Sequence, residues 1–150
     1  MANKTLWVPE SAADLLTTEL NNMGDTTTVV DGADYDNATN KFRWADFFFF
    51  GTFDAACNAG AYAELHIFYK LDGTHYGDGE DGDVAGVQPN ANTLHGAFVI
   101  GAQADAYAQL LGIPLRPFAF RAGLKLATGQ DLTAVDTHWV KMYPYNEELQ

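Results

Sequence analysis

The chain has 150 residues, 47% of them hydrophobic, and it carries 20 acidic side chains against eight basic ones. This length and composition predict one packed domain and exclude a disordered chain. The formal net charge of -12 excludes ready binding to nucleic acids or anionic membranes, because both require surfaces rich in Lys and Arg. We therefore expect a protein partner that is contacted through a limited patch.

The N-terminal residues and the cysteine content predict a cytosol-like compartment. The first apolar run, Leu6-Trp7-Val8, is too short for the apolar region of a signal peptide. No apolar stretch approaches the roughly 18 residues of a membrane-spanning helix. Cys57 is the only cysteine, so no intramolecular disulfide can form.

Residues 1–23 are predicted to form an N-terminal arm, ahead of a β-sandwich domain that spans residues 24–150. Ser11-Ala12-Ala13-Asp14 resembles a helix capping box, so residues 14–20 could form a short helix. The nearby threonines and asparagines are equally compatible with an extended arm. Leu6, Trp7 and Val8 either fold back on their own domain or dock on a neighbouring subunit, where tryptophan is a favoured anchor.

Alternation of apolar and polar residues predicts β-strands after the arm, each with one face in the core. The predicted strands are residues 44–53, 61–71, 94–101, 118–126 and 135–143. The run Phe47-Phe48-Phe49-Phe50 is of strand length and suggests a strand that is buried on both faces.

Turn sequences such as Asp31-Gly32 and Asp72-Gly73 separate these runs. Short strands with regular turns predict an all-β fold, a two-sheet antiparallel sandwich of jelly-roll type. The predicted core is Phe47, Phe49, Leu65, Ile67, Tyr69, Phe98, Ile100, Phe118, Phe120, Leu124 and Leu126.

The sequence offers little support for catalysis, and we expect neither an enzyme nor a cofactor. Ser11 is the only serine, and it lies in the predicted arm. Cys57 has no basic neighbour in sequence that would stabilise a thiolate, so a buried thiol is expected. The four histidines, His66, His75, His95 and His138, lack the spacing of a zinc site.

The acidic segment 72–83 is the one candidate for metal binding, since it holds five carboxylates. Calcium prefers several oxygen ligands on a flexible loop, with Asp78, Asp81 and Asp83 as the possible ligands here. The spacing does not match an EF-hand, because no glutamate closes the loop. A solvated loop between strands is the alternative interpretation.

Two further groups of residues are candidates for an interface. Arg116, Arg121 and Lys125 lie within ten residues and either form ordinary ion pairs or meet an acidic partner. Phe48, Phe50 and Phe68 are apolar where a half-buried strand would need polar residues, which suggests an oligomer interface.

Two stretches of the sequence carry a resemblance to a known group of proteins. They are residues 60–76 (GAYAELHIFYKLDGTHY) and residues 112–125 (GIPLRPFAFRAGLK), the latter followed by Thr128-Gly129 and by MYPYNEE at residues 142–148. Together they resemble small virion-associated proteins of tailed bacteriophages, which are similar to jelly-roll-like capsid decoration, or cement, proteins.

The resemblance implies a structural role. The chain would form homotrimers on the outer face of a phage head, bind the major capsid protein and stabilise the shell, after assembly in the bacterial cytoplasm. An alternative is a carbohydrate-binding jelly-roll module of a phage fibre or another virion appendage, because jelly rolls recur in lectins. The side chains that could then stack on sugar are Trp7, Trp44, Trp139 and Tyr76. A metal-dependent jelly-roll enzyme is disfavoured by the lack of a histidine-rich motif.

Overall fold

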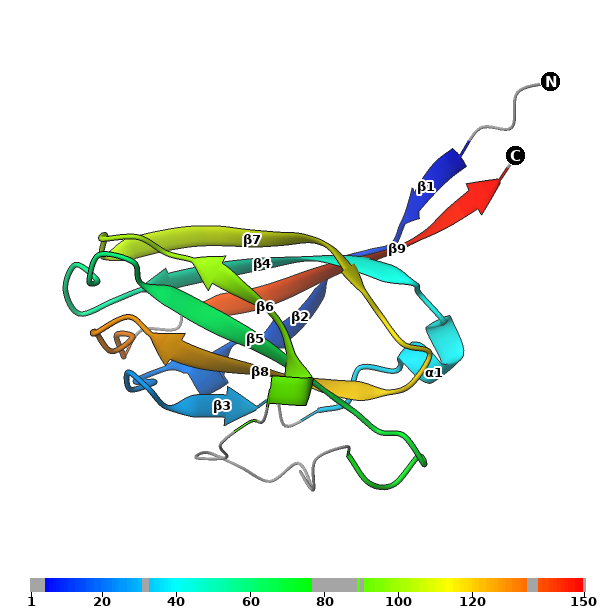
Figure 1. Cartoon of the computed structure of the whole chain (residues 1–150), viewed down its shortest axis with the longest axis horizontal. Helices are drawn as coiled ribbons and strands as arrows, with labels where there is room; N and C mark the ends of the chain where they lie inside the picture. The colour runs from blue at the N-terminus through cyan, green and yellow to red at the C-terminus, as the bar shows by residue number, and fades with distance from the viewer. Residues whose placement is uncertain (1–4, 31–32, 77–88, 90, 135–137, 150) are drawn as a thin grey trace.

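The chain folds into a two-sheet antiparallel β-sandwich of jelly-roll type, as the sequence predicts (Figure 1). The computed structural model describes residues 5–30, 33–76, 89, 91–134 and 138–149. None of the helices within these ranges is long and apolar enough to cross a membrane.

Two antiparallel sheets form the layers of the sandwich. The first has the order β1 (Thr5–Pro9), β9 (Trp139–Leu149), β4 (Trp44–Thr52), β7 (Asp105–Pro114), and β2 (Ala13–Leu16) also pairs with β9. The second has the order β3 (Thr28–Val30), β8 (Phe120–Ala127), β5 (Tyr62–Tyr69), β6 (Leu94–Val99). The helices are short: η1 (Thr18–Leu20), α1 (Asn37–Asn40) and η3 (Ala91–Thr93).

The core between the sheets is the one predicted from alternation, with one partial exception. All the predicted core residues are buried except Phe118, which is partly buried against the core from the loop that precedes β8. The core also takes side chains that the sequence did not indicate: Leu15, Leu16, Leu20, Met23, Phe53, Leu132, Val140 and Met142. Residues before position 24 therefore contribute side chains to the core of the sandwich.

The phenylalanine run of β4 has two different faces. Phe47 and Phe49 are fully buried, whereas Phe48 and Phe50 are partly exposed on the outer face of the first sheet. The expectation of a strand buried on both faces is therefore wrong. In the part of the chain that the structure describes, neighbouring aromatic rings of the same face shield Phe48 and Phe50, and no second layer of the fold does so.

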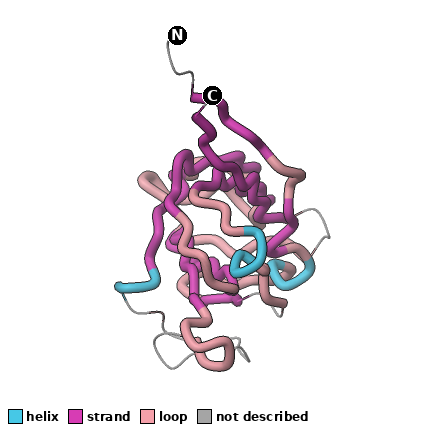
Figure 2. The backbone as a smooth tube through the Cα atoms, turned by 90° about the vertical axis from the view of Figure 1, so that its right-hand side faces the viewer, coloured by secondary structure: helices cyan, strands magenta, loops and turns pink. Residues whose placement is uncertain are grey.

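Residues 5–16 follow one edge of β9. Ala13–Leu16 is extended and pairs with β9 near Met142, and only the single 3-10 turn η1 follows it. Thr5–Pro9 pairs with the other half of β9, from Leu149 back to Tyr145. Because β4 begins opposite Tyr145, the last residues of β9 pair only with β1. The two strands form a two-stranded ribbon that projects from the sandwich (Figures 1 and 2).

Phe68, predicted as an exposed interface residue, is buried instead. It is 1% exposed and packs with Val30 and Tyr76 over the outer face of the second sheet. The segment after β5 turns back, so that Lys70 bridges to Tyr76 and places the tyrosine ring beside the sheet. Gly123 on β8 makes room for Phe68, because a Cβ there would lie 2.9 Å from the Phe68 ring.

Candidate binding groove

The outer face of β9, β4 and β7 concentrates aromatic side chains. The pairing places Phe50 between Tyr107 of β7 and Trp139 of β9, and it places Asp46 opposite Tyr143. Alternate residues of a strand point to the same face, so the strand register alone brings these side chains together. The outer-face residues of the three strands are Asp46, Phe48, Phe50, Tyr107, Gln109, Leu111, Trp139, Lys141, Tyr143 and Tyr145.

The aromatic rings of this face are in mutual contact. The ring centroids of Phe50 and Tyr107 lie 4.5 Å apart, and those of Phe50 and Trp139 lie 5.8 Å apart. Phe48 meets Tyr143 edge to face at 5.3 Å. Tyr107 is nevertheless 72% exposed and Tyr143 41% exposed, so much of the aromatic surface faces solvent. Such contacts hold the rings in fixed orientations without covering them.

A shallow groove crosses this face. One hollow of about 450 Å³ lies between Phe48, Tyr107, Trp139 and Tyr143. A second, of about 600 Å³, adjoins Leu111 and Gly112. Both hollows are also lined by Pro9, Asp46 and Tyr145, so they are two parts of one groove. A concave, mostly apolar surface with a few polar groups is the usual form of a ligand site.

Asp46 is the carboxylate at the centre of the groove. It accepts a hydrogen bond of 2.8 Å from the backbone N–H of Gly112 and one of 3.4 Å from the Tyr145 hydroxyl. Gly112 has a φ of +66°, a left-handed conformation that favours glycine, at the point where the pairing of β4 with β7 shifts register. Burial, followed by the charge of Asp46, raises the pKa of Tyr145, which stays a neutral donor.

The rim of the groove carries a balanced pair of charges. Lys141 lies 3.3 Å from Asp14 of β2, and its ammonium group lies 5.1 Å from the centre of the Trp139 ring. The positive charge of Lys141 offsets one carboxylate in a chain that is otherwise strongly acidic. The groove and its rim therefore combine flat aromatic rings with a carboxylate, Asp46, and an ammonium group, Lys141.

The predicted site residues are distributed over separate parts of the fold. Phe48, Phe50 and Trp139 lie in the groove or beside it, and Trp44 begins the same strand, β4. Leu6, Trp7 and Val8 lie in the ribbon, where their backbones pair with Glu148, Glu147 and Asn146. Phe68 and Tyr76 are buried on the other sheet, so neither can contact a partner or stack on a sugar.

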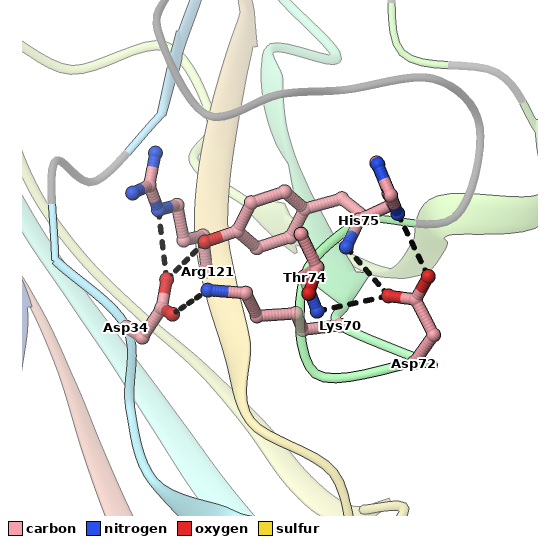
Figure 3. Close-up of polar contacts among 7 residues, drawn as sticks. Asp34, Lys70, Asp72, Thr74, His75 and Arg121 are labelled. Carbon is pink, nitrogen blue, oxygen red and sulfur yellow. Dashed lines mark hydrogen bonds and ion pairs between the residues drawn. The ribbon is translucent and has the colours of Figure 1, made fainter.

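The three predicted basic residues have different partners. Asp34 bonds with Arg121 at 2.9 Å and with Lys70 at 3.0 Å, and it also accepts a hydrogen bond from the Tyr76 hydroxyl (Figure 3). Burial and the bond to Asp34 raise the pKa of Tyr76 to about 12. Lys125 lies 3.9 Å from Glu64, and Arg116 belongs to the loop between β7 and β8. Arg121 and Lys125 therefore form ordinary ion pairs.

Figure 3 also shows how the turn after β5 is built. Asp72 accepts hydrogen bonds from the backbone N–H groups of Thr74 and His75, at 2.8 and 2.6 Å, and contacts the His75 ring. These bonds, the His75 backbone first, hold the pKa of Asp72 well below its usual range. Asp78, Asp81 and Asp83 lie outside the described residues. Within those residues, no three His, Cys, Asp or Glu side chains gather as a metal site would require.

Cys57, His66 and His138 lie in buried environments that favour structural roles for all three. Cys57 is buried, and burial raises the pKa of its thiol, as expected of an inert cysteine. His66 contacts the Thr93 hydroxyl at 2.9 Å. His138 accepts a hydrogen bond at Nδ1 from the Thr52 N–H and donates one from Nε2 to the Thr133 carbonyl. Each of the two imidazoles is 3% exposed or less and is satisfied by neighbouring strands or loops.

The groove residues that sequence reasoning missed include Asp46, Tyr107 and Tyr143. Strand β7 was not predicted, because residues 105–114 carry apolar side chains on both faces and a register shift interrupts their alternation. The apolar residues Ala106, Ala108 and Leu110 recur at every second position and are the signal that could have indicated this strand. Asp46 could not be recognised as a site residue from sequence, because its role depends on its hydrogen bonds with Gly112 and Tyr145.

No protein-family model matches the chain, and none of the curated proteins matches it. The solved structures that match the chain include two that cover nearly all of it. One is the CBM36-1 domain of a multidomain xylanase from the hindgut metagenome of Trinervitermes trinervoides, with 14% identity, a TM-score of 0.40 and coverage of 98% of this chain and 97% of that one. The other is the carbohydrate-binding module CBM36 in complex with calcium and xylotriose, with 12% identity, a TM-score of 0.39 and coverage of 97% and 99%. The assignment of the fold follows from the strand pairing within the chain.

Proposed function

We propose that the chain is a carbohydrate-binding protein whose site is the aromatic groove on the outer face of β9, β4 and β7. The observation that carries this proposal is the combination of exposed, mutually fixed rings with a central carboxylate in one groove. Sugar rings present apolar C–H faces and polar hydroxyl edges. A surface that offers both kinds of contact within a few ångströms is suited to them.

Each group has a defined role in this proposal. Tyr107 and Trp139 supply ring surface for stacking at one end of the groove. Asp46 accepts hydrogen bonds from sugar hydroxyls, since its own bonds to Gly112 and Tyr145 leave carboxylate lone pairs free. Bonds to a charged acceptor are roughly twice as strong as neutral ones. A neutral glycan fits better than an acidic one, because the chain carries a net charge of -12.

A glycan array followed by calorimetry tests this proposal. The wild-type protein should bind one class of neutral oligosaccharide, and Tyr107→Ala should weaken binding about fivefold, since the loss of a ring contact costs on the order of 1 kcal/mol. Tyr62→Ala is the matched control, because Tyr62 is 39% exposed on the second sheet. A protein that binds no glycan, or equal loss in both variants, contradicts the proposal.

A second candidate function is decoration of a phage shell, and the projecting ribbon favours it. Two strands with free edges are marginally stable alone and invite a further strand or surface. In this alternative the chain would form a homotrimer, bind the major capsid protein and reside on the virion. Light scattering would then give three times the 16.4 kDa of the chain, and purified virions would contain it in a fixed ratio to the shell protein. A monomer that is absent from virions would contradict this alternative.

A further inference from the structure

A hollow of about 320 Å³, separate from the aromatic groove, lies between the end of β5, η3 and the loop from β7 to β8. Its polar lining comes from Tyr69, Asn92, Thr93, His95 and Arg116. It shares no lining residue with the aromatic groove. It therefore constitutes a separate candidate site.

Arg116 is held in place through its backbone. Its N–H lies 3.2 Å from the Tyr69 hydroxyl, and its carbonyl accepts a hydrogen bond of 2.7 Å from the amide of Asn37. Asn37 is fully buried and is itself fixed by two bonds to the Phe42 backbone. The loop therefore presents the arginine side chain from an ordered base, which reduces the entropy lost when it binds a ligand.

The guanidinium of Arg116 contacts no carboxylate among the residues the structure describes. Four of the other cations do contact one: Lys70 and Arg121 meet Asp34, Lys125 meets Glu64, and Lys141 meets Asp14. The Arg116 guanidinium instead lies 5.6 Å from the centre of the Tyr69 ring. A planar cation stacked on a ring keeps its N–H groups available for a bidentate contact with a carboxylate.

His95 adds a hydrogen-bond acceptor beside this cation. Its Nδ1 lies 2.8 Å from the Thr93 carbonyl, which can only accept, so Nδ1 carries the proton and Nε2 is left with a lone pair. Burial lowers the pKa of His95, and the charge of Arg116 lowers it further, so the imidazole is neutral near pH 7. A cation on an anchored backbone and a neutral acceptor thus line the same hollow.

We propose that this hollow binds a compact hydroxy-carboxylate of the uronic acid class. The carboxylate pairs with the guanidinium of Arg116, and an adjacent hydroxyl donates to Nε2 of His95. A free sugar acid and the terminal residue of an acidic glycan share this chemistry. The net negative charge of the chain opposes anions at long range, but salt screens that repulsion beyond about 8–10 Å. The proposal stands independently of the aromatic groove.

Titration of the isotope-labelled protein with glucuronate tests the proposal, with glucose as the uncharged counterpart. We expect amide shifts around Arg116, His95 and Asn92, with a dissociation constant on the order of 1 mM. Glucose should leave these signals unchanged. A glucuronate-terminated disaccharide identifies the source, since tighter binding than free glucuronate indicates a glycan end and weaker binding indicates the free acid.

Variants separate a direct role of the arginine from a structural one. Arg116→Gln should abolish the glucuronate shifts, and Arg116→Lys, which keeps the charge but loses the planar fork, should weaken binding at least about tenfold. Arg43→Gln removes the same charge from an exposed residue that does not line the hollow, and it should bind normally. A thermal melt checks that each variant is folded. Absence of shifts in the wild-type protein, or binding that survives in Arg116→Gln, overturns the proposal.

Discussion

The adjacent residues Phe49 and Phe50 test the two-faced structure of β4 by paired alanine substitutions. Phe49 is fully buried between the sheets and packs against Phe53 and Phe98, with ring centroids 6.5 and 5.8 Å away. Phe50 lies on the outer face, against Tyr107 and Trp139. The two side chains are chemically identical, so any difference in cost comes from their surroundings.

The expected magnitudes differ by more than the error of measurement. Phe49→Ala removes a core ring and leaves a cavity, which costs about 3–5 kcal/mol of unfolding free energy. Phe50→Ala loses only part of a ring's burial and two ring contacts, about 1–2 kcal/mol. For a chain of this size each kcal/mol shifts the melting temperature by about 2–4 °C. The two costs differ by about 1–4 kcal/mol, so Phe49→Ala should melt about 2–16 °C below Phe50→Ala.

Chemical denaturation with circular dichroism detection measures both changes. The slope against denaturant should stay constant, which shows that stability and not the unfolded state has changed. Equal losses in the two variants would mean that Phe50 is as buried as Phe49, and the groove would not exist as described. A larger loss in Phe50→Ala would reverse the assignment of the two faces.

Three further predictions concern stability. Burial lowers the pKa of His66 below 6.5, so the unfolded chain binds the proton more readily than the folded chain. The unfolding free energy should therefore fall as the pH decreases from about 7 to about 5, and His66→Gln should reduce this pH dependence in thermal melts. Asp34→Asn removes the charged partner of Lys70 and Arg121 and should lower the unfolding free energy by about 1–3 kcal/mol in urea titrations, whereas no loss would mean that these contacts are solvent-screened. Deletion of residues 1–10 removes pairing only with the last residues of β9, so the β-sheet circular dichroism signal should persist, and an unfolded product would place the ribbon within the folding unit.

The sandwich and most of its core could be predicted from sequence because alternation is a local property of each strand. Leu65, Ile67 and Tyr69 repeat at a period of two, and all three are buried as expected. The run of four phenylalanines has no apolar–polar alternation. The sequence could therefore assign Phe47 and Phe49 to the core, but it could not show whether a second layer covers Phe48 and Phe50. The outcome depended on which sheet face lacks a covering layer, and that is a property of the assembled fold.

The less predictable features depend on contacts that alternation within a single strand does not show. Phe68 is covered by Tyr76, which the turn at Asp72 directs back over the sheet. Leu15 and Leu16 follow a capping-like sequence, yet pairing with β9 makes them extended and buries them in the core. The groove forms from three strands far apart in the chain, and only their register brings Asp46 and its neighbours together.

The indole N–H of Trp139 provides the most direct test of carbohydrate binding in the groove. Its signal in a nuclear magnetic resonance titration with neutral oligosaccharides reports on the ring that lies against Phe50 and Tyr107. We predict a saturable shift of this signal, accompanied by shifts at Asp46 and Tyr107 and by none around Tyr62 on the other sheet. A Trp139 signal that stays unchanged while shifts appear elsewhere, or with every oligosaccharide tested, would contradict the assignment of the groove as a glycan site.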